Sequence, residues 1–414
     1  MEAIGLGYSK QYGNNKWVKL YKKIHFLVGG MNMDSNHKGH EYVVYVGTYT
    51  DKNDPDDPTT KSEGIYSFKT DSLTGAFTPI STTSDIKNPT FITIDDNQDY
   101  LYSVTETGME SDNSKGNIYA YKIDKQTAQL NFVNTQPTNG LGPCYISINS
   151  KDPKCIVTAN YGSGSVALFP ILQNGSIGNL SGFNEHEGSG VNQDRQEAPH
   201  AHFADYFILG QDEIYVFSAD LGADKLYLYN VKPNTLELSL IREIKLHDGA
   251  GPRHLTYDNS KRYIYLLNEL DSTVTVFDWD KNMDIIQTVT ALPKGYSGES
   301  YAADIHISPS GKFLLATNRG DDSIAVFSIE ESTGKIEIIG HTSTQGGHPR
   351  NFAIIEGAEP DISLVFVANQ DSNNIVTLKL NESTGQLIPN GQIISVPAPV
   401  CIKLLHASGS YNIY

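Results

Sequence analysis

The sequence predicts an all-β fold, a seven-bladed β-propeller with four antiparallel strands per blade, and three observations predict it. A short motif recurs seven times, strand and hairpin patterns follow most of its copies, and the unmatched strands at the two ends complement each other. The 36 Gly and 18 Pro are also spread along all 414 residues. That spread is typical of many short strands joined by turns.

The recurring motif is a small or turn residue, a proline and an alternating strand. Its copies are NPTFITI, GPCYISI, APHAHFA, GPRHLTY, HPRNFAI and APVCIKL, and YAADIHI fills the remaining place without a proline. With Pro89, Pro143, Pro199, Pro252, Ala302, Pro349 and Pro399 in register, the spacings are 54, 56, 53, 50, 47 and 50 residues. Units of this length that consist of short strands are typical of propeller blades.

Further strands are expected after each of the first six motifs. KCIVTANYGSGSVALF from Lys154 and YIYLLNELDSTVTVF from Tyr263 alternate apolar and polar residues around a Gly, Asn, Asp or Ser turn. This pattern predicts a strand, a hairpin and a strand. A fourth strand follows, often after a Thr-Gly turn such as Thr333 and Gly334.

The two ends of the chain are expected to complete one blade together. APVCIKL from Ala398 has no further strands after it, while EYVVYVGTYT from Glu41 and GIYSFKT from Gly64 have no motif before them. Pairing them removes strand edges that an open array would expose. We therefore expect one propeller from 41 to 405, a leader at 1–40 and a tail at 406–414. The lysine-rich leader is expected to be a disordered segment, an over-long start or a weak mitochondrial targeting segment.

Charge and cysteine content exclude several classes of protein. The formal net charge of -17, with no basic cluster in the propeller region, argues against a nucleic-acid or anionic membrane partner. No apolar stretch reaches the roughly 20 residues that cross a bilayer. The three cysteines include no CxxC pair and no zinc spacing. We expect a cytoplasmic monomer or weak homo-oligomer with no metal and no other cofactor.

Residues at one register of every blade should form a ring at the mouth of the central channel. The position after the motif proline holds Thr90, Cys144, His200, Arg253, Ala303, Arg350 and Val400. Second strands end at Asn160, Asp220, Asn268, Asn318 and Asn369, followed by Tyr161, Leu221, Glu269, Arg319 and Gln370. Three of the six arginines fall on these rings, and Arg195 lies just before the PHAH motif. Guanidinium groups bind carboxylates and phosphates well, so these arginines indicate a pocket for an anionic substrate. The alternative is a structural role, in which each arginine ties neighbouring blades together.

His200 and His202 alternate onto one face of their expected strand. Beside the arginines, a histidine or carboxylate could remove a proton from water while a guanidinium stabilises the oxyanion formed at an ester carbonyl. This chemistry suits lactone hydrolysis, and a hydrogen-bonding role in the channel wall is the alternative for each histidine. Asp220, Asn268 and Asn318 are candidates for substrate contact, with turn capping as the alternative. His254 and His306 are expected to be ordinary strand residues.

Several of these segments together resemble one family. GAGPRHL from Gly249, the pair Asn268 and Glu269, YAADIHISPSGKFLLATNRG from Tyr301, GGHPRNF from Gly346 and YVGTYT from Tyr45 are similar to the lactonase family of seven-bladed propellers. That family includes propeller-type 6-phosphogluconolactonases and fungal 3-carboxy-cis,cis-muconate cyclising enzymes. The resemblance implies catalytic roles for His200, Arg253, Glu269 and a second arginine, with Arg319 preferred to Arg350. We list His202, Asp220, Asn268, Asn318, His348, Arg350 and Arg195 as expected substrate-binding residues.

The resemblance implies hydrolysis of an anionic sugar lactone such as 6-phosphogluconolactone. Cycloisomerisation of a carboxylated muconate is the main alternative, and a non-catalytic scaffold that binds a protein partner is a third. Two segments depart from the family, an acidic insertion at 51–62 and an extended loop at 182–197. If the second loop covers the pocket, Arg195 and His186 become candidates for substrate contact.

Overall fold

The computed structural model describes residues 39–51, 61–108, 115–210 and 213–406. The expected leader lies almost wholly outside these residues, as do most of the tail and most of the insertion at 51–62. Within the described part, no helix is long and apolar enough to span a membrane. Its 28 strands, β1 to β28, form seven four-stranded antiparallel sheets, which confirms the predicted propeller.

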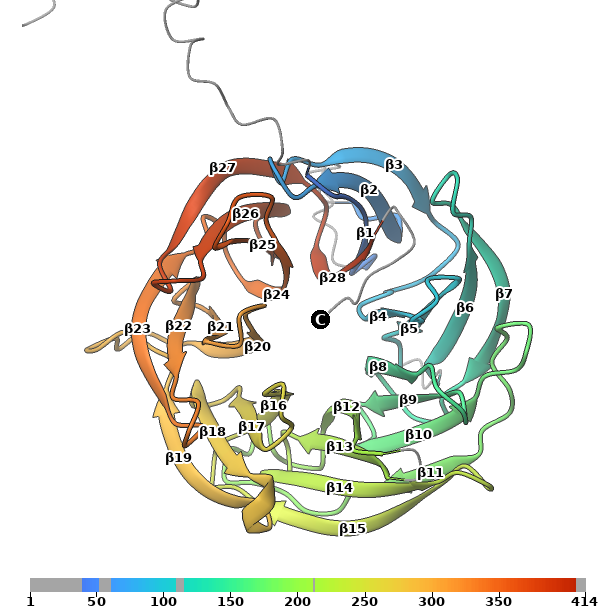
Figure 1. Ribbon diagram of the computed structural model, residues 1–414. Coiled ribbons are helices and arrows are strands. Elements are labelled where there is room, and N and C mark those ends of the chain that lie inside the picture. Colours follow the sequence, from blue (N-terminus) through green and yellow to red (C-terminus); the bar gives the residue numbers. More distant parts are fainter. Residues whose placement is uncertain (1–38, 52–60, 109–114, 211–212, 407–414) are drawn as a thin grey trace, which may run out of the picture. The chain divides into compact units, whose positions relative to one another are not determined.

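Six blades each use four consecutive strands (Figure 1). Blade 1 has β4 (Ile92–Ile94), β5 (Tyr100–Thr105), β6 (Asn117–Ile123) and β7 (Leu130–Pro137); blade 2 has β8 (Pro143–Asn149), β9 (Cys155–Asn160), β10 (Ser165–Pro170) and β11 (Gly182–Glu185). Blade 3 has β12 (Ala201–Ile208), β13 (Ile214–Asp220), β14 (Lys225–Lys232) and β15 (Glu237–Lys245); blade 4 has β16 (Pro252–Tyr257), β17 (Tyr263–Asn268), β18 (Thr273–Asp278) and β19 (Asp284–Thr290). Blade 5 has β20 (Tyr301–Ile307), β21 (Phe313–Arg319), β22 (Ser323–Ile329) and β23 (Ile336–Ser343); blade 6 has β24 (Pro349–Glu356), β25 (Ile362–Asn369), β26 (Asn374–Asn381) and β27 (Leu387–Ser395). A 3-10 helix, Trp279–Lys281, connects β18 to β19.

The seventh blade, here the closing blade, joins the two ends of the chain. Its order is β28 (Pro399–His406), β1 (Glu41–Thr48), β2 (Ile65–Asp71) and β3 (Thr78–Thr83). Tyr42 lies opposite His406 and Thr48 opposite Pro399, so β1 and β28 are antiparallel along their whole length. The predicted sharing of one blade between the two ends is confirmed.

The inner strands form a closed ring. β4, β8, β12, β16, β20, β24 and β28 each contact the next, and β28 contacts β4 again. The second strands lie between neighbouring blades, and every residue of β9 and β17 is buried. Apolar runs in these strands therefore face the core on both sides. The inner strands surround the propeller axis (Figure 1).

The register of blade 3 differs from the one that its proline predicts. In blade 4, Pro252 lies opposite Asn268, whereas in blade 3 Ala201 lies opposite Asp220. Pro199 therefore precedes the strand by two residues, and His202 rather than His200 shares the register of Arg253. Pairing with the second strand determines the register, and the longer connection before β12 allows the proline to shift.

The segment expected to be an extended loop at 182–197 begins as a strand. Gly182–Glu185 is β11, which pairs with β10 as the outer strand of blade 2. The connection to β12 therefore begins at His186. It still carries Arg195 towards the axis, as the contacts of that residue show.

Candidate functional site

Two rings of residues meet at the end of the axis where the motifs begin. The motif ring consists of Thr90, Cys144, His202, Arg253, Ala303, Arg350 and Val400, and the strand-end ring of Tyr49, Glu106, Tyr161, Leu221, Glu269, Arg319 and Gln370. Tyr49 and Glu106 do not fit the strand-end pattern of the sequence, because their strands end in threonine instead of Asn or Asp. The signal was present, since both residues follow a strand-end threonine, in YVGTYT and SVTE.

Glu269 is the centre of an arginine cluster drawn from blades 4 and 5 and from the connection between β11 and β12. Its Oε2 lies 2.8 Å from Nε of Arg253 and 2.9 Å from Nη2 of Arg319. Its Oε1 lies 2.7 Å from Nη2 of Arg195. The structure thus brings together four of the residues named from the sequence.

The charges in this cluster are strongly coupled. Burial alone would raise the pKa of Glu269, but Arg319 and Arg253 hold it well below its usual range. Burial, together with Arg319, lowers the pKa of Arg253 to about 9. At neutral pH, Glu269 is therefore a carboxylate and Arg253 a cation. Glu269 is consequently a weak base and a strong fixed counter-charge.

Backbone carbonyls fix the other faces of these guanidinium groups. Arg253 donates from Nη1 to the carbonyl of Ala303. Arg319 donates to the carbonyls of Tyr301 and Ala302, at 3.2 and 3.1 Å. The alternative expected from the sequence was that the arginines tie neighbouring blades together. Arg253 of blade 4 makes such a tie to blade 5, whereas Arg319 bonds to carbonyls of its own blade.

Arg350 of blade 6 extends the positive region towards the neighbouring closing blade. Its Nη2 donates to the Tyr49 hydroxyl at 3.1 Å, and that hydroxyl donates to Glu106 at 2.8 Å. Thr90 also donates to Glu106, at 2.7 Å. Four guanidinium groups, of Arg195, Arg253, Arg319 and Arg350, thus face two carboxylates, of Glu106 and Glu269. The site is cationic although the chain carries a formal net charge of -17.

His200 lies at the edge of the cluster. Its ring stacks on Tyr161 with centroids 4.5 Å apart, and the Tyr161 hydroxyl accepts from Arg195 at 3.5 Å. Nδ1 donates to the Tyr161 carbonyl at 3.0 Å, because a carbonyl can only accept. Nε2 lies 3.1 Å from Glu197, whose side chain is 55% exposed.

His202 occupies the motif ring between Cys144 and Arg253. Burial and Arg253 lower the pKa of His202 well below its usual range, so its imidazole is neutral at pH 7. Its ring meets that of Tyr161 edge-on, with the centroids 5.6 Å apart. A neutral imidazole beside four guanidinium groups can bind an uncharged hydroxyl or carbonyl of a substrate.

His254 and His306 were expected to be ordinary strand residues, but they belong to one network, in which His254 is buried and the His306 side chain is 37% exposed. His254 Nε2 accepts from Arg253 at 3.2 Å, and its Nδ1 donates to Asp304 at 2.9 Å. The other oxygen of Asp304 lies 3.0 Å from Nε2 of His306 and 2.5 Å from the Asn351 amide. This network supports Arg253 from the side opposite to Glu269.

Three expected substrate-binding residues are fully buried and engaged in hydrogen bonds within the fold. Asp220 accepts from the backbone N–H groups of His200 and Ala223. Asn268 donates to Thr273 and Thr275, and Asn318 donates to the carbonyl of Ala291. All three are 0% exposed. Turn capping, the alternative expected from the sequence, describes Asp220. Asn268 bonds instead across its hairpin, and Asn318 bonds to the preceding blade.

His186 and His348 differ in their access to the cluster. The His186 ring is fully buried, and its Nδ1 lies 2.6 Å from Asp220. The structure therefore does not bring His186 to the site. The His348 side chain is 30% exposed, and its Nε2 lies 3.5 Å from Nη1 of Arg319. Only His348 of these two can contact a molecule bound at the arginines.

Comparisons with known proteins agree with this architecture. Residues 43–404 match the family model described as "Lactonase, 7-bladed beta-propeller". A 6-phosphogluconolactonase of Bacillus subtilis is 34% identical over 369 residues, covering 88% of this chain and 99% of the relative. A 6-phosphogluconolactonase of Formosa agariphila is 35% identical over 83% of this chain and 94% of the relative. The solved periplasmic gluconolactonase of Pseudomonas aeruginosa superposes with a TM-score of 0.79 at 29% identity, covering 89% of this chain and 99% of its own.

Proposed function

The chain belongs to the family of seven-bladed β-propeller lactonases, and from this membership we propose that it hydrolyses a phosphorylated sugar lactone of the 6-phosphogluconolactone type. The observation that carries the proposal is the cluster of Glu269 with Arg195, Arg253 and Arg319. A buried cationic site in an acidic protein suits an anionic substrate and an oxyanion.

The arginines are proposed to divide two tasks between them. Arg253 and Arg319 are fixed by Glu269 and by backbone carbonyls, so they act as the oxyanion stabilisers. Arg350 and the partly exposed Arg195 hold the phosphate of the substrate, together with His348. Fixed cations are effective here because they need little reorganisation when charge develops on the carbonyl oxygen.

His200 is the proposed general base. Its Nδ1 proton is directed to the Tyr161 carbonyl, and in the structure its Nε2 donates to the exposed Glu197. Once Glu197 moves aside and Nε2 has released its proton, the Nε2 lone pair can take a proton from water. The hydroxide adds to the lactone carbonyl and forms a tetrahedral oxyanion. When this collapses, the ring C–O bond breaks, and the proton on Nε2 goes to the leaving ring oxygen. The product is the open hydroxy acid.

The two alternatives are weaker on different grounds. The named relatives are lactonases, which favours hydrolysis over the cycloisomerisation of a muconate. A scaffold has no need for a buried carboxylate surrounded by three arginines, since such clusters are costly to desolvate.

We also propose a monomer in a reducing compartment such as the cytoplasm, where the buried thiols of Cys144, Cys155 and Cys401 remain free.

The first test is the rate of 6-phosphogluconolactone hydrolysis by the wild type, Arg253→Ala and His200→Ala, each corrected for spontaneous hydrolysis. We expect kcat to fall by roughly 100-fold or more in both variants, as when an oxyanion donor or a general base is removed. Gluconolactone without the phosphate should give a lower kcat/KM with the wild type. Arg242→Ala is the matched control, because Arg242 lies on the outer strand β15 and donates to Asn282. A wild type no faster than the spontaneous reaction would refute the proposal.

A further inference from the structure

Six of the seven junctions between neighbouring blades are tied at the outer rim by a side chain that bonds to the backbone of the next blade. These rim ties are Asn134 to Ile177, Asn184 to Leu238, Arg242 to Asn282, Gln287 to Ile336, Thr342 to Leu387 and Asn390 to Thr74. Asn134 and Gln287 each bond to both the N–H and the carbonyl of their partner. Each tie holds the outer parts of two neighbouring blades together.

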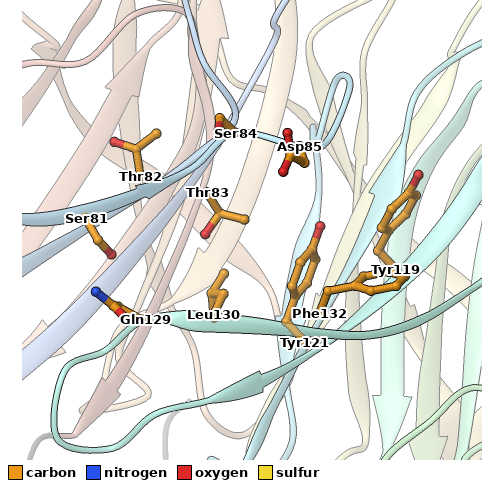
Figure 2. Close-up of a pocket in the computed structure, with 10 residues that line it drawn as sticks. All are labelled: Ser81, Thr82, Thr83, Ser84, Asp85, Tyr119, Tyr121, Gln129, Leu130 and Phe132. Carbon is orange, nitrogen blue, oxygen red and sulfur yellow. The ribbon is translucent and has the colours of Figure 1, made fainter.

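The seventh junction, between β3 of the closing blade and β7 of blade 1, is built differently. Among the residues that the structure describes, no hydrogen bond joins these two outer strands. A hollow of about 560 Å³ separates them, a volume within the range of small-molecule sites. We call this hollow the open seam, and Figure 2 shows the ten residues that line it: Ser81, Thr82, Thr83, Ser84, Asp85, Tyr119, Tyr121, Gln129, Leu130 and Phe132.

One wall of the open seam is aromatic. Tyr119 and Tyr121 alternate onto the same face of β6, and their rings are 16° from parallel with centroids 6.2 Å apart. Phe132 lies opposite Tyr121 in the register of β6 and β7. Its side chain is an exposed apolar group, 59% accessible, at the edge of this wall. The wall offers flat apolar surface to a ligand.

The facing wall is polar. Ser81 and Thr83 alternate on β3 and point towards blade 1 in Figure 2, and Ser84 and Asp85 continue the wall beyond the strand. Within the described residues, the side chains of Thr83, Ser84 and Asp85 accept or donate no hydrogen bond, and neither do the Tyr119 and Tyr121 hydroxyls. These groups keep their full capacity for a ligand.

We propose that the open seam binds a neutral oligosaccharide of two or three pyranose units. A pyranose has apolar C–H faces that pack on aromatic rings and hydroxyls at its edge that bond to serine, threonine and aspartate, which matches the two walls. The lining includes Asp85 and no lysine or arginine, so a phosphorylated sugar is disfavoured. The site therefore differs in charge from the arginine cluster and is independent of the function proposed there.

Saturation-transfer NMR and titration calorimetry with maltotriose and cellotriose test this site in the full-length protein. We expect at least one of these trisaccharides to bind the wild type. Phe132→Ala should weaken that binding by roughly tenfold, since it removes a stacking surface of aromatic size. Thr83→Val should weaken it several-fold by removing one hydroxyl at similar volume. Ile393→Ala is the matched control, because Ile393 is 58% exposed on the outer strand β27.

Two outcomes would overturn the proposal. One is the absence of saturation transfer from the wild type to either trisaccharide. The other is binding at a different place. Binding that persists unchanged in Phe132→Ala would mean that the sugar occupies another surface, and binding that 6-phosphogluconate displaces would mean that it occupies the arginine cluster. A circular dichroism spectrum of Phe132→Ala that matches the wild type verifies that this variant is folded, and it keeps the result separate from the test of the proposed reaction.

Discussion

Glu269 determines where three guanidinium groups point. Each of its oxygens contacts at least one arginine, while backbone carbonyls hold Arg253 and Arg319 from behind. The carboxylate is fully engaged and strongly acidic, so its contribution is position and charge rather than proton transfer. The cations, in turn, retain the faces that a substrate can approach.

Replacing Glu269 by glutamine should destabilise the fold and reduce turnover together. The variant leaves Arg253 and Arg319 buried without their counter-charge, and losing one partner of a buried ion pair costs about 3–5 kcal/mol. Urea unfolding and kcat measured on the same preparation check this. Glu243→Gln is the control, because its pair with Lys225 is partly exposed and should contribute less than about 1 kcal/mol. Equal stability of Glu269→Gln and wild type would contradict the buried-pair account.

Buried neutral histidines should make the protein sensitive to acid. Burial and Arg253 lower the pKa of His254 to about 3, from an ordinary 6.5. Between these two values the unfolded chain binds a proton that the folded site excludes, so the free energy of unfolding decreases as the pH falls. Urea unfolding at about pH 6.5 and pH 5 should show a smaller decrease in His254→Asn, by about 2 kcal/mol. Parallel pH profiles for variant and wild type would show that His254 does not cause the slope.

The site could be predicted from the sequence where the repeat is regular. Arg253, Glu269 and Arg319 lie at repeated positions next to recognisable strand ends, so alignment of the blades was enough to bring them together. Tyr49 and Glu106 were missed because threonine replaces the usual strand-end amide. His202 was assigned to the wrong register because strand pairing, and not proline, sets the alignment of blade 3.

Strands were predictable in proportion to their burial. The second and third strands alternate apolar and polar residues on either side of a turn, so they could be located from the sequence. The second strands β9 and β17 are also buried along their whole length. Outer strands are half solvated, and β11, with only four residues and no fully buried side chain, was taken for part of a loop. What holds the outer strands is a set of single polar side chains, the rim ties, which no hydrophobic pattern reveals.

The rim ties should contribute measurably to stability. Gln287 bonds to both the carbonyl and the N–H of Ile336, each at 2.9 Å, so Gln287→Ala should lower the free energy of unfolding by about 1–2 kcal/mol. Gln129→Ala is the matched control, since Gln129 lines the open seam and its amide bonds to no described residue. Equilibrium urea unfolding of both variants checks the difference. Equal effects would mean that the ties add nothing beyond ordinary surface contacts.

The closing blade makes the ring of seven sheets continuous. β28 contacts β24 and β4 as well as pairing with β1, so the last strand of the chain completes the inner ring and the sheet at once. The sequence predicted this closure because an unmatched motif at one end required unmatched strands at the other. If the ring opens inside the closing blade, between β28 and β1, the hydrogen bonds that pair these two strands must break. They therefore resist opening of the ring.

A circular permutant separates this closure from the rest of the fold. Because Tyr42 lies opposite His406, a short linker can join residue 406 to residue 41 as a hairpin, with new ends between β27 and β28. The permutant keeps every strand pair but closes the ring through side-chain contacts alone. We expect it to fold and retain lactonase activity but to unfold faster than a native-order chain of residues 39–406, because its ring can open without breaking a sheet. Unfolding rates in urea measure this, and equal rates would mean that side-chain packing between blades, rather than the shared sheet, limits the opening of the propeller.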